Sequence, residues 1–345
     1  MHEILIADEW IGADRIGIST TPRPTAPDTV PVRLTGRRRN VFSIRMGFFL
    51  RKSCRLCWPF SATRYQAKPK GLASMKNALL FAVFSACLCI SDLQAGQTDD
   101  VAIANAVQLI HREAGEHRLI LIGEMHGTKE VPQLIGALVS SYASTEAVEL
   151  ALEVHRSEQD AFVRYLASDG SEKARAALKS GAFWTVRGTQ HDGRRNEDMI
   201  DLIEHVRQLR AEGRHVSLLA IDNATNENAD SQTRDEAMAT RVREAFAKLR
   251  HGRLLVLSGN VHAMLARPGN APPEMQTPMG SYLRDLGAYS INVGANEGEF
   301  WACLSTCGPV AVPKNGSTSG RSDDGVYDLE IVLPEFTVAR LLGAK

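Results

Sequence analysis

The chain has 345 residues with 40 Lys+Arg and 40 Asp+Glu, which predicts a neutral globular protein of one or two domains. The charge is unevenly distributed: residues 1–74 hold 13 Lys+Arg against 5 Asp+Glu, whereas residues 96–345 hold 26 against 34, a net charge of −8. The acidic part disfavours nucleic acid and anionic membrane surfaces as partners.

The sequence changes character at Met75. Residues 1–74 show no sustained apolar periodicity and include a Pro-, Thr- and Arg-rich stretch at 20–40, a composition typical of disorder. From Met75 onward Lys76, an apolar segment at 78–90 and the small Ala95 form the three parts of a secretory signal peptide. Because export machinery reads this signal at the start of a chain, we expect translation to begin at Met75, residues 1–74 to be a non-native or disordered extension, residues 75–95 to be removed, and residues 96–345 to form the mature domain.

Two alternatives remain for this segment. An internal membrane anchor would need about 20 apolar residues, and the segment at 78–90 is shorter. The sequence "FSAC" loosely resembles a lipobox, which would place a lipid anchor on Cys87 and make the protein an outer-membrane lipoprotein. We therefore expect a periplasmic or secreted protein without a transmembrane anchor.

Residues 96–345 retain two cysteines, Cys303 and Cys307 in "CLSTC". In an oxidising compartment this spacing favours a local disulfide. A metal pair is the alternative, but this part of the sequence has no second cysteine pair to complete such a site.

Short apolar runs alternate with amphipathic segments, the pattern of parallel strands joined by crossover helices. It predicts a single α/β domain with a mostly parallel sheet and helices on both faces. The expected strands are 118–123, 148–153, 215–221, 253–258, 289–293 and 327–333, and the expected helices are 101–115, 131–142, 196–212 and 234–249. "TRDE" predicts a capping box with Thr233 as the N-cap of the last helix.

Two segments depart from this alternation. Residues 157–193 contain no strand candidate, which predicts a helical insertion that covers the cleft at the C-terminal edge of the strands. Residues 313–325 are rich in Gly, Ser and Asp and predict a hairpin connection before the final strand.

Polar residues follow four of the expected strands. Glu124 and His126 follow the first, Glu153 ends the second, Asp222 follows the third, and His262 follows the fourth. Because the carboxyl ends of parallel strands meet at one edge, we expect these side chains to converge. Each alone has an ordinary explanation as a loop or capping residue.

The spacing Gly-x-x-His occurs at two strand ends, in "GEMH" and "GNVH". Glycine permits a sharp turn, and the histidine after it can face the cleft as a base or a metal ligand. Arg234 is also informative, because a cation in the first turn of a helix is unfavourable, whereas Asp235 there is favourable. His191 and Arg194 lie in a loop rich in Gly and charge from which they could reach the cleft, but a solvated loop is the favoured explanation. Trp184 suits packing.

Five segments resemble, in order, the superfamily of erythromycin esterases, ChaN-like haem-binding proteins and Tiki/TraB proteins. They are "LILIGEMHG", "ALEV", "TRDEAMATRV", "LLVLSGNVHA" and "PMGSYLRDLGAYSINV", and the match spans residues 105–295. The hallmark of this superfamily is two Gly-x-x-His motifs with a glutamate and an arginine between them, here His126, Glu153, Arg234 and His262. The resemblance implies a site whose chemistry differs among members: hydrolysis with a histidine base, metal-dependent proteolysis or haem binding.

The residues can be assigned roles in each chemistry. For hydrolysis of an ester or amide-type substrate, small molecule or peptide, His126 would deprotonate water, Glu124 or Glu153 would orient it, and His262 with Arg234 would stabilise the oxyanion. No Gly-x-Ser-x-Gly motif provides a serine nucleophile. A divalent metal would be held by His126, His262 and Glu153.

Haem would need an axial His or Tyr, for which Tyr165 in the insertion is the candidate, in an envelope protein of haem or iron uptake. A non-catalytic interaction protein is the third class, and the intact Glu and His positions argue against it. The sequence ranks the hydrolase first.

Overall fold

The computed structural model describes residues 100–185, 192–223, 231–303 and 305–343, without the side chains of residues 231 and 232. The expected disordered extension, the signal peptide, the lipid-anchor residue Cys87 and His191 all lie outside these residues. Among the described residues, no helix is long and apolar enough to cross a membrane.

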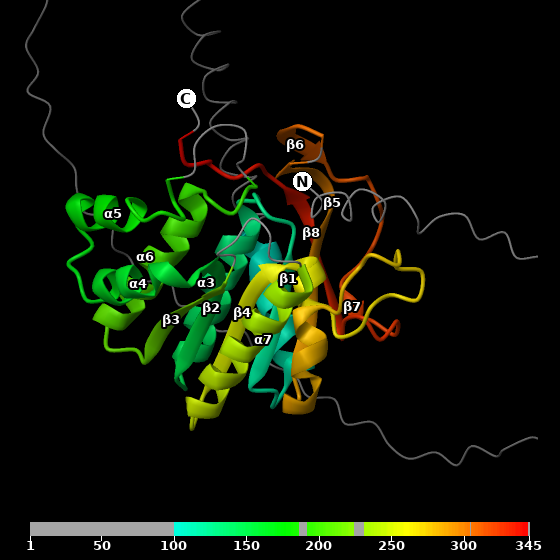
Figure 1. The fold of residues 1–345 in the computed structure, drawn as a ribbon, viewed down its shortest axis with the longest axis horizontal. Helices are drawn as coiled ribbons and strands as arrows, with labels where there is room; N and C mark the ends of the chain where they lie inside the picture. The colour runs from blue at the N-terminus through cyan, green and yellow to red at the C-terminus, as the bar shows by residue number, and fades with distance from the viewer. Residues whose placement is uncertain (1–99, 186–191, 224–230, 304, 344–345) are drawn as a thin grey trace, which may run out of the picture. The chain divides into compact units, whose positions relative to one another are not determined.

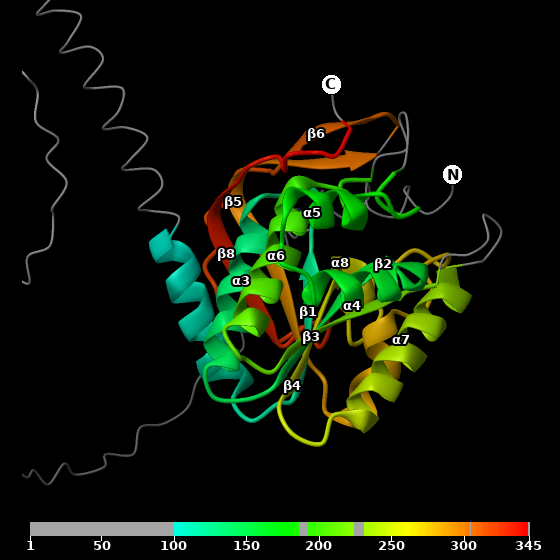
Figure 2. The same cartoon turned by 90° about the vertical axis from the view of Figure 1, so that its left-hand side faces the viewer.

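The described residues form one sheet with helices on both faces (Figures 1 and 2). The strand order is β3-β2-β4-β1-β5-β8-β7, and β6 pairs with β5 outside this path. The pairs from β3 to β8 are parallel, whereas β7 with β8 and β6 with β5 are antiparallel. The predicted fold class is confirmed. The strands are β1 (Leu119–Glu124), β2 (Val148–His155), β3 (Val216–Asp222), β4 (Arg253–Gly259), β5 (Tyr289–Cys303), β6 (Cys307–Ala311), β7 (Gly320–Arg321) and β8 (Leu329–Phe336).

The central strands are apolar along most of their length because both of their faces are covered. In β1, Ile120 and Ile122 belong to one core, and Leu119 and Leu121 belong to the other. A helix over residues 100–114, α3 (Glu130–Ala143), α4 (Gln159–Leu166) and α6 (Glu197–Ala211) cover the first face. The second face is covered by α7 (Ser231–Lys248), the one-turn α8 (Asn260–Ala263) and the 3-10 segment η2 (Met279–Leu286). Figure 2 shows α3 and α6 on one side of the sheet and α7 on the other.

Between β2 and α6 the described residues contain no strand, as predicted. The segment after β2 instead forms the 3-10 turn η1 (Arg156–Glu158), α4 and α5 (Glu172–Lys179). Whether this insertion covers the cleft stays a prediction. The segment before the last strand forms β7, which pairs antiparallel with β8, so the expected hairpin connection is confirmed.

Two boundaries differ from the sequence prediction. The helix expected to start with Thr233 as its N-cap begins at Ser231, so Thr233 lies inside its first turn and the predicted capping box is wrong. The fifth strand continues ten residues beyond the expected end at 293: residues 294–298 still pair with β8, and residues 299–303 pair with β6. The extension was missed because only some of its residues, such as Ala295 and Phe300, are buried in the core, so it carries no apolar run. Gly298, at φ +100°, accommodates the bend there against the backbone of Phe336.

Candidate functional site

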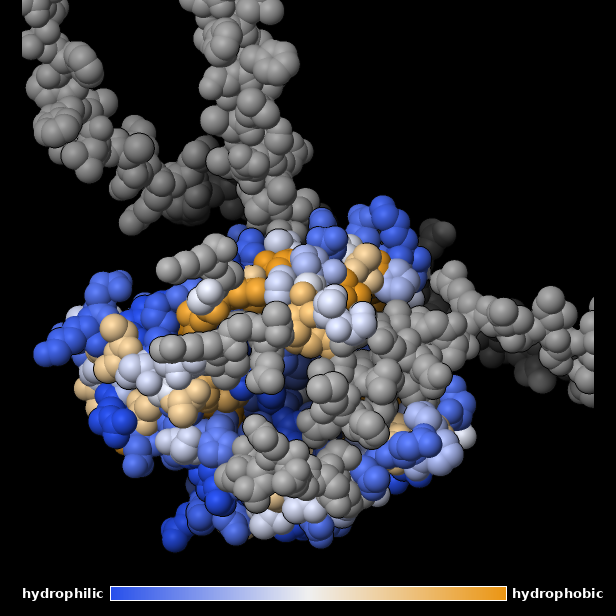
Figure 3. Space-filling view, turned by 45° about the horizontal axis from the view of Figure 1, so that its top comes forward, coloured by the Kyte–Doolittle hydropathy of each residue, from blue (hydrophilic) through white to orange (hydrophobic). Residues whose placement is uncertain are grey.

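The predicted polar residues meet at the C-terminal edge of β1, β2, β3 and β4. Glu124 ends β1, Asp222 ends β3, Glu153 lies near the end of β2, and His262 lies on α8, which follows β4 directly. The three carboxylates are almost fully buried. In Figure 3, which turns the top of Figure 1 toward the reader, hydrophilic residues lie at the centre of the face. The convergence follows from the parallel order of the strands, which brings their carboxyl ends together.

Glu153 is the centre of the group. Its Oε1 accepts hydrogen bonds from Arg234 Nη2 at 2.6 Å and from Arg194 Nη1 at 2.7 Å, and its Oε2 accepts the Gly259 backbone N–H at 2.7 Å. Burial alone would raise the pKa of Glu153, but the neighbouring cations, Arg194 first among them, hold it well below its usual range. Glu153 is therefore an ionised, fully engaged carboxylate.

Asp222 shares the two guanidinium groups with Glu153. Arg234 donates to it through Nε and Nη2, both at 3.0 Å, and Arg194 donates through Nη1 at 3.1 Å. Burial opposes ionisation of Asp222, but its hydrogen bond and charge interaction with Arg234 lower its pKa. The unfavourable cation near the start of α7 is thus explained by two buried carboxylates.

His126 lies beside this network and is held from one side only. Its Nδ1 is 2.9 Å from Glu124 Oε1, and its Nε2 is 3.6 Å from Glu153 Oε2, beyond hydrogen-bond distance. Within the described residues Nε2 has no hydrogen-bond partner, and 22% of the side chain is exposed. Burial lowers the pKa of His126, but the charge of Glu153 and the bond to Glu124 outweigh it and raise the pKa above 6.5.

Glu124 is the other member of this pair. It is buried at the end of β1, and burial raises its pKa, against the lowering effect of the hydrogen bond to His126. A carboxylate acceptor places the ring proton of a neutral His126 on Nδ1, which leaves a lone pair on Nε2. This is the arrangement that a general base requires.

His262 has a different environment. Its Nε2 is 3.0 Å from Arg234 Nη1, and because a guanidinium only donates, this nitrogen accepts. Its Nδ1 therefore carries the proton and donates to Asp235 Oδ1 at 2.8 Å, and the same oxygen accepts the Met279 backbone N–H at 2.7 Å. His262 is occupied on both nitrogens and helps to orient Arg234.

Two glycines allow this packing. A Cβ on Gly259 would lie 3.0 Å from His126 Nε2, and a Cβ on Gly123 would lie 2.8 Å from the Asn260 Cα. Each glycine of the two Gly-x-x-His motifs therefore permits another part of the chain to pack closely against it.

Arg194, Asp192 and the pairing role of Asp235 were missed from the sequence. Asp192 binds Arg194 through Nε at 2.9 Å and Nη2 at 2.6 Å, and it binds Arg195 Nη1 at 2.8 Å. A solvated loop was the favoured prediction for Arg194 and a position in the cleft the alternative; its side chain is only 17% exposed. No local pattern in the sequence marks it, because its partners Glu153 and Asp222 lie 41 and 28 residues away in the sequence.

The donor set does not fit the predicted metal site. Both oxygens of Glu153 are engaged, and the Arg234 guanidinium lies against the Nε2 that His262 would offer to a metal. Two buried guanidinium groups would also repel a dication at this position. Within the described ranges, no group of three or more His, Cys, Asp or Glu side chains is arranged to hold a metal ion.

Tyr165, the candidate haem ligand, lies on α4 in the first core. Its hydroxyl donates to Glu204 Oε2 at 2.8 Å, and burial followed by this bond raises its pKa to about 12. Ligation of iron would require the phenol to leave Glu204 and to lose a proton that its surroundings retain. Among the interactions of the described residues, none joins Tyr165 to the Glu153 cluster. This cluster consists of Glu124, His126, Glu153, Arg194, Asp222, Arg234 and His262.

His155 and Trp184 have structural roles. His155 accepts the Ser157 backbone N–H with Nδ1 and caps η1. Trp184 is buried and packs edge-on against Phe183, as predicted. A cavity of about 280 Å³ lies against β2, β3 and α7, and none of its lining residues belongs to the Glu153 cluster.

The expected disulfide between Cys303 and Cys307 is present. It joins β5 and β6 at directly opposed positions, so it closes their hairpin. Because both sulfur atoms are joined in this bond, the two cysteines do not form the alternative metal-binding pair.

The fold and site define an α/β protein with a His, Glu and Arg cluster at the carboxyl ends of parallel strands. No family model and no curated protein matches the chain. Solved structures do match: an erythromycin esterase, EreC, in the open conformation of a histidine-to-asparagine mutant, has a TM-score of 0.52 at 10% identity and covers 69% of this chain and 95% of its own.

Two further structures give the same result. A Bacillus cereus protein has a TM-score of 0.51 at 12% identity and covers 69% of this chain and 93% of its own. A succinoglycan biosynthesis protein has a TM-score of 0.51 at 10% identity, with coverage of 68% and 92%. At these identities the likeness shows the fold, so the erythromycin-esterase fold implied by the sequence resemblance is confirmed.

Proposed function

We propose that this protein is an exported hydrolase of an ester or amide-type substrate in which His126 is the general base. The observation that carries the proposal is the state of His126: its Nδ1 is held by the buried Glu124, and its partly exposed Nε2 has no hydrogen-bond partner in the described part of the chain. A base oriented in this way can remove a proton from a water molecule that attacks an acyl carbon.

Water is the nucleophile in this proposal, because the sequence contains no Gly-x-Ser-x-Gly motif. Deprotonation of water by His126 Nε2 and attack on the carbonyl give a tetrahedral oxyanion. His126 then returns the proton to the leaving alcohol or amine. Arg194 and Arg234, whose positions are fixed by Glu153 and Asp222, supply the positive charge near the oxyanion.

This assignment revises the role of His262. Because its Nε2 accepts from Arg234, it has no N–H to offer an oxyanion, and it orients Arg234 instead. Glu153 likewise orients the two arginines rather than water, since both of its oxygens are engaged. Export is supported by the disulfide, which persists in oxidising compartments.

The test is a screen of ester and peptide substrates with purified protein, run with and without a chelator. We expect turnover that the chelator does not change. Turnover that is lost with the chelator and restored by a divalent metal would overturn the metal-free mechanism. No turnover across the screen would contradict the hydrolase proposal.

A further inference from the structure

The β5–β6 hairpin starts at the first core, where Phe300 is buried, and its far end lies near the site. Its last rungs pair Trp301 with Pro309 and Cys303 with Cys307, where the disulfide closes it. Trp301 and Cys303 are only half-buried, and Glu299 is exposed. Beyond the buried Phe300 the hairpin is a two-stranded ribbon, which contributes little stability by itself, so the disulfide adds a covalent link at its end.

Trp301 contacts the residue that follows the proposed base. Its backbone N–H donates to the Gly127 carbonyl at 3.2 Å. Gly127 has φ +71°, and a Cβ there would lie 2.6 Å from the Trp301 Cβ. The turn after His126 is therefore shaped to fit against the hairpin.

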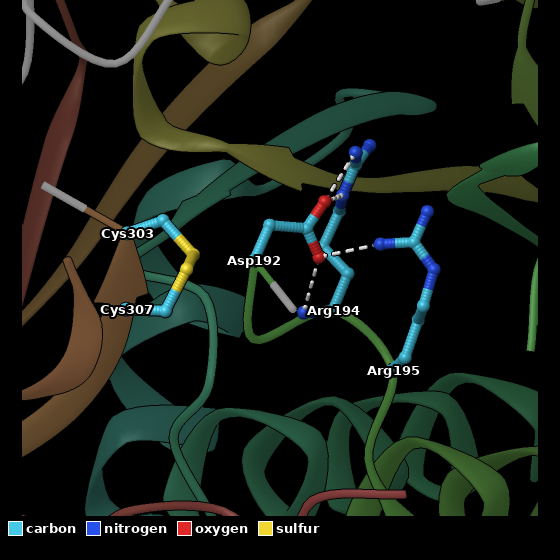
Figure 4. Close-up of a disulfide and its surroundings, with 5 residues drawn as sticks. All are labelled: Asp192, Arg194, Arg195, Cys303 and Cys307. Atoms are coloured by element: carbon cyan, nitrogen blue, oxygen red, sulfur yellow. Dashed lines mark hydrogen bonds and ion pairs between the residues drawn. A yellow bond between two sulfur atoms is a disulfide. The ribbon is translucent and has the colours of Figure 1, made fainter. Parts of the chain in front are cut away.

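The same tryptophan contacts the loop that carries Arg194. Gly193 has φ +85°, and a Cβ there would lie 2.7 Å from the Trp301 carbonyl oxygen and 2.9 Å from the Gly127 nitrogen. Three backbones thus pack together at one point. Figure 4 shows the Cys303–Cys307 disulfide beside the loop of Asp192, Arg194 and Arg195.

We propose that Trp301 is a positioning residue that holds the loops of His126 and Arg194 in register, and that the disulfide makes this hold depend on oxidation. The inference rests on the proposed function for the role of His126. A dithiol supplies two electrons to the S–S bond, which breaks to give two cysteine thiols, while the dithiol becomes a disulfide. The hairpin then loosens, and both loops lose a common support.

Hydrogen exchange tests the contact without reference to activity. The oxidised protein, the protein reduced with a dithiol, and a Cys303→Ser/Cys307→Ser variant are compared at the Trp301 amide. We expect exchange there to be at least tenfold faster without the disulfide. The Leu254 amide, bonded to the Arg118 carbonyl at 2.8 Å at the far end of the sheet, is expected to be unchanged and reports that the fold persists.

Kinetics test the consequence for the site. We expect loss of the disulfide to lower kcat by roughly ten- to a hundredfold, as displacement of a catalytic group by about 1 Å does, and reoxidation of the wild type to restore it. KM should change less, because the disulfide does not line the cluster. Glu299→Ala, an exposed change on the same hairpin, is the matched control and should leave kcat unchanged.

Two results would overturn the inference. One is unchanged exchange at Trp301 in protein whose reduction is verified by a mass increase of two hydrogens. The other is faster exchange at Trp301 with kcat unaltered. Absence of turnover in the oxidised wild type would instead count against the proposed function, and the exchange experiment would still decide whether the disulfide controls the contact.

Discussion

At the scale of single residues, two carboxylates tune the protonation of His126. Burial lowers its pKa, but the charge of Glu153 and the hydrogen bond to Glu124 together raise it. A general base must be neutral, so activity should appear as the pH rises through a pKa above 6.5 and should be lost below it.

Glu124→Gln should shift this profile. The amide oxygen can still accept from Nδ1, but the charge that raises the pKa is gone. We expect the acid limb of kcat/KM to move to lower pH, with kcat on the plateau reduced because a neutral acceptor stabilises the imidazolium less. A pH–rate profile of both proteins measures this, and an acid limb that stays in place would show that Glu124 does not tune His126.

Glu153 should matter for stability as well as for activity. It neutralises two buried guanidinium groups, and removal of one partner from a buried ion network costs about 3–5 kcal/mol. Glu153→Gln should therefore lower the free energy of unfolding by about that amount at pH 7. A denaturant titration measures it, and a change below about 1 kcal/mol would contradict this account.

The ionisation of Glu153 also determines how the stability of the fold changes with pH. The folded pKa of Glu153 lies below its unfolded value, so its ionisation stabilises the fold above pH 4.5 and that stability is lost as the pH falls below it. The Glu153→Gln variant should lose less stability between pH 5 and pH 3 than the wild type does. Asp222 retains part of the dependence, because its pKa is also lowered.

At the scale of elements, the edge strand β3 is protected by side chains. Gln159 donates through Nε2 to the Leu218 carbonyl at 3.0 Å and accepts the Ala220 N–H with Oε1 at 2.9 Å, as a neighbouring strand would. Arg241 Nε donates to the Ala220 carbonyl at 2.7 Å. These contacts satisfy backbone groups that an open edge would offer to another chain.

Gln159→Ala should destabilise the protein by about 1–3 kcal/mol, because it removes the partners of two backbone groups. It should also increase self-association, which light scattering at rising concentration detects. Gln208→Ala, an exposed change on α6, serves as the control. Equal stability and scattering in the two variants would show that other contacts protect this edge.

Some elements around the site could be predicted from the sequence, and others could not. The six main strands follow from apolar runs, which are local signals. The convergence of Glu124, Glu153 and His262 then follows from the parallel arrangement of these strands. The role of Arg194 depends on its contact with Glu153 on β2, 41 residues earlier in the sequence, and no local pattern encodes that contact. The second half of β5 was missed because it carries no apolar run.

At the scale of the whole molecule, the sequence before residue 100 bears on where the domain works. The disulfide suits an oxidising compartment. We expect a chain started at Met75 to be exported and to begin at Gly96 after cleavage, which mass spectrometry of the exported protein determines. Acylation at Cys87 or retention of residues 1–74 would contradict this processing.

The central claim is that His126 removes the proton from water, and chemical rescue of His126→Ala tests it most directly. We expect at least a thousandfold loss of kcat in a folded variant and partial recovery when imidazole is added, because imidazole can occupy the vacated space and accept the proton. His155→Ala, at the end of β2 but outside the cluster, should retain full activity. A His126→Ala variant as active as the wild type would contradict the account.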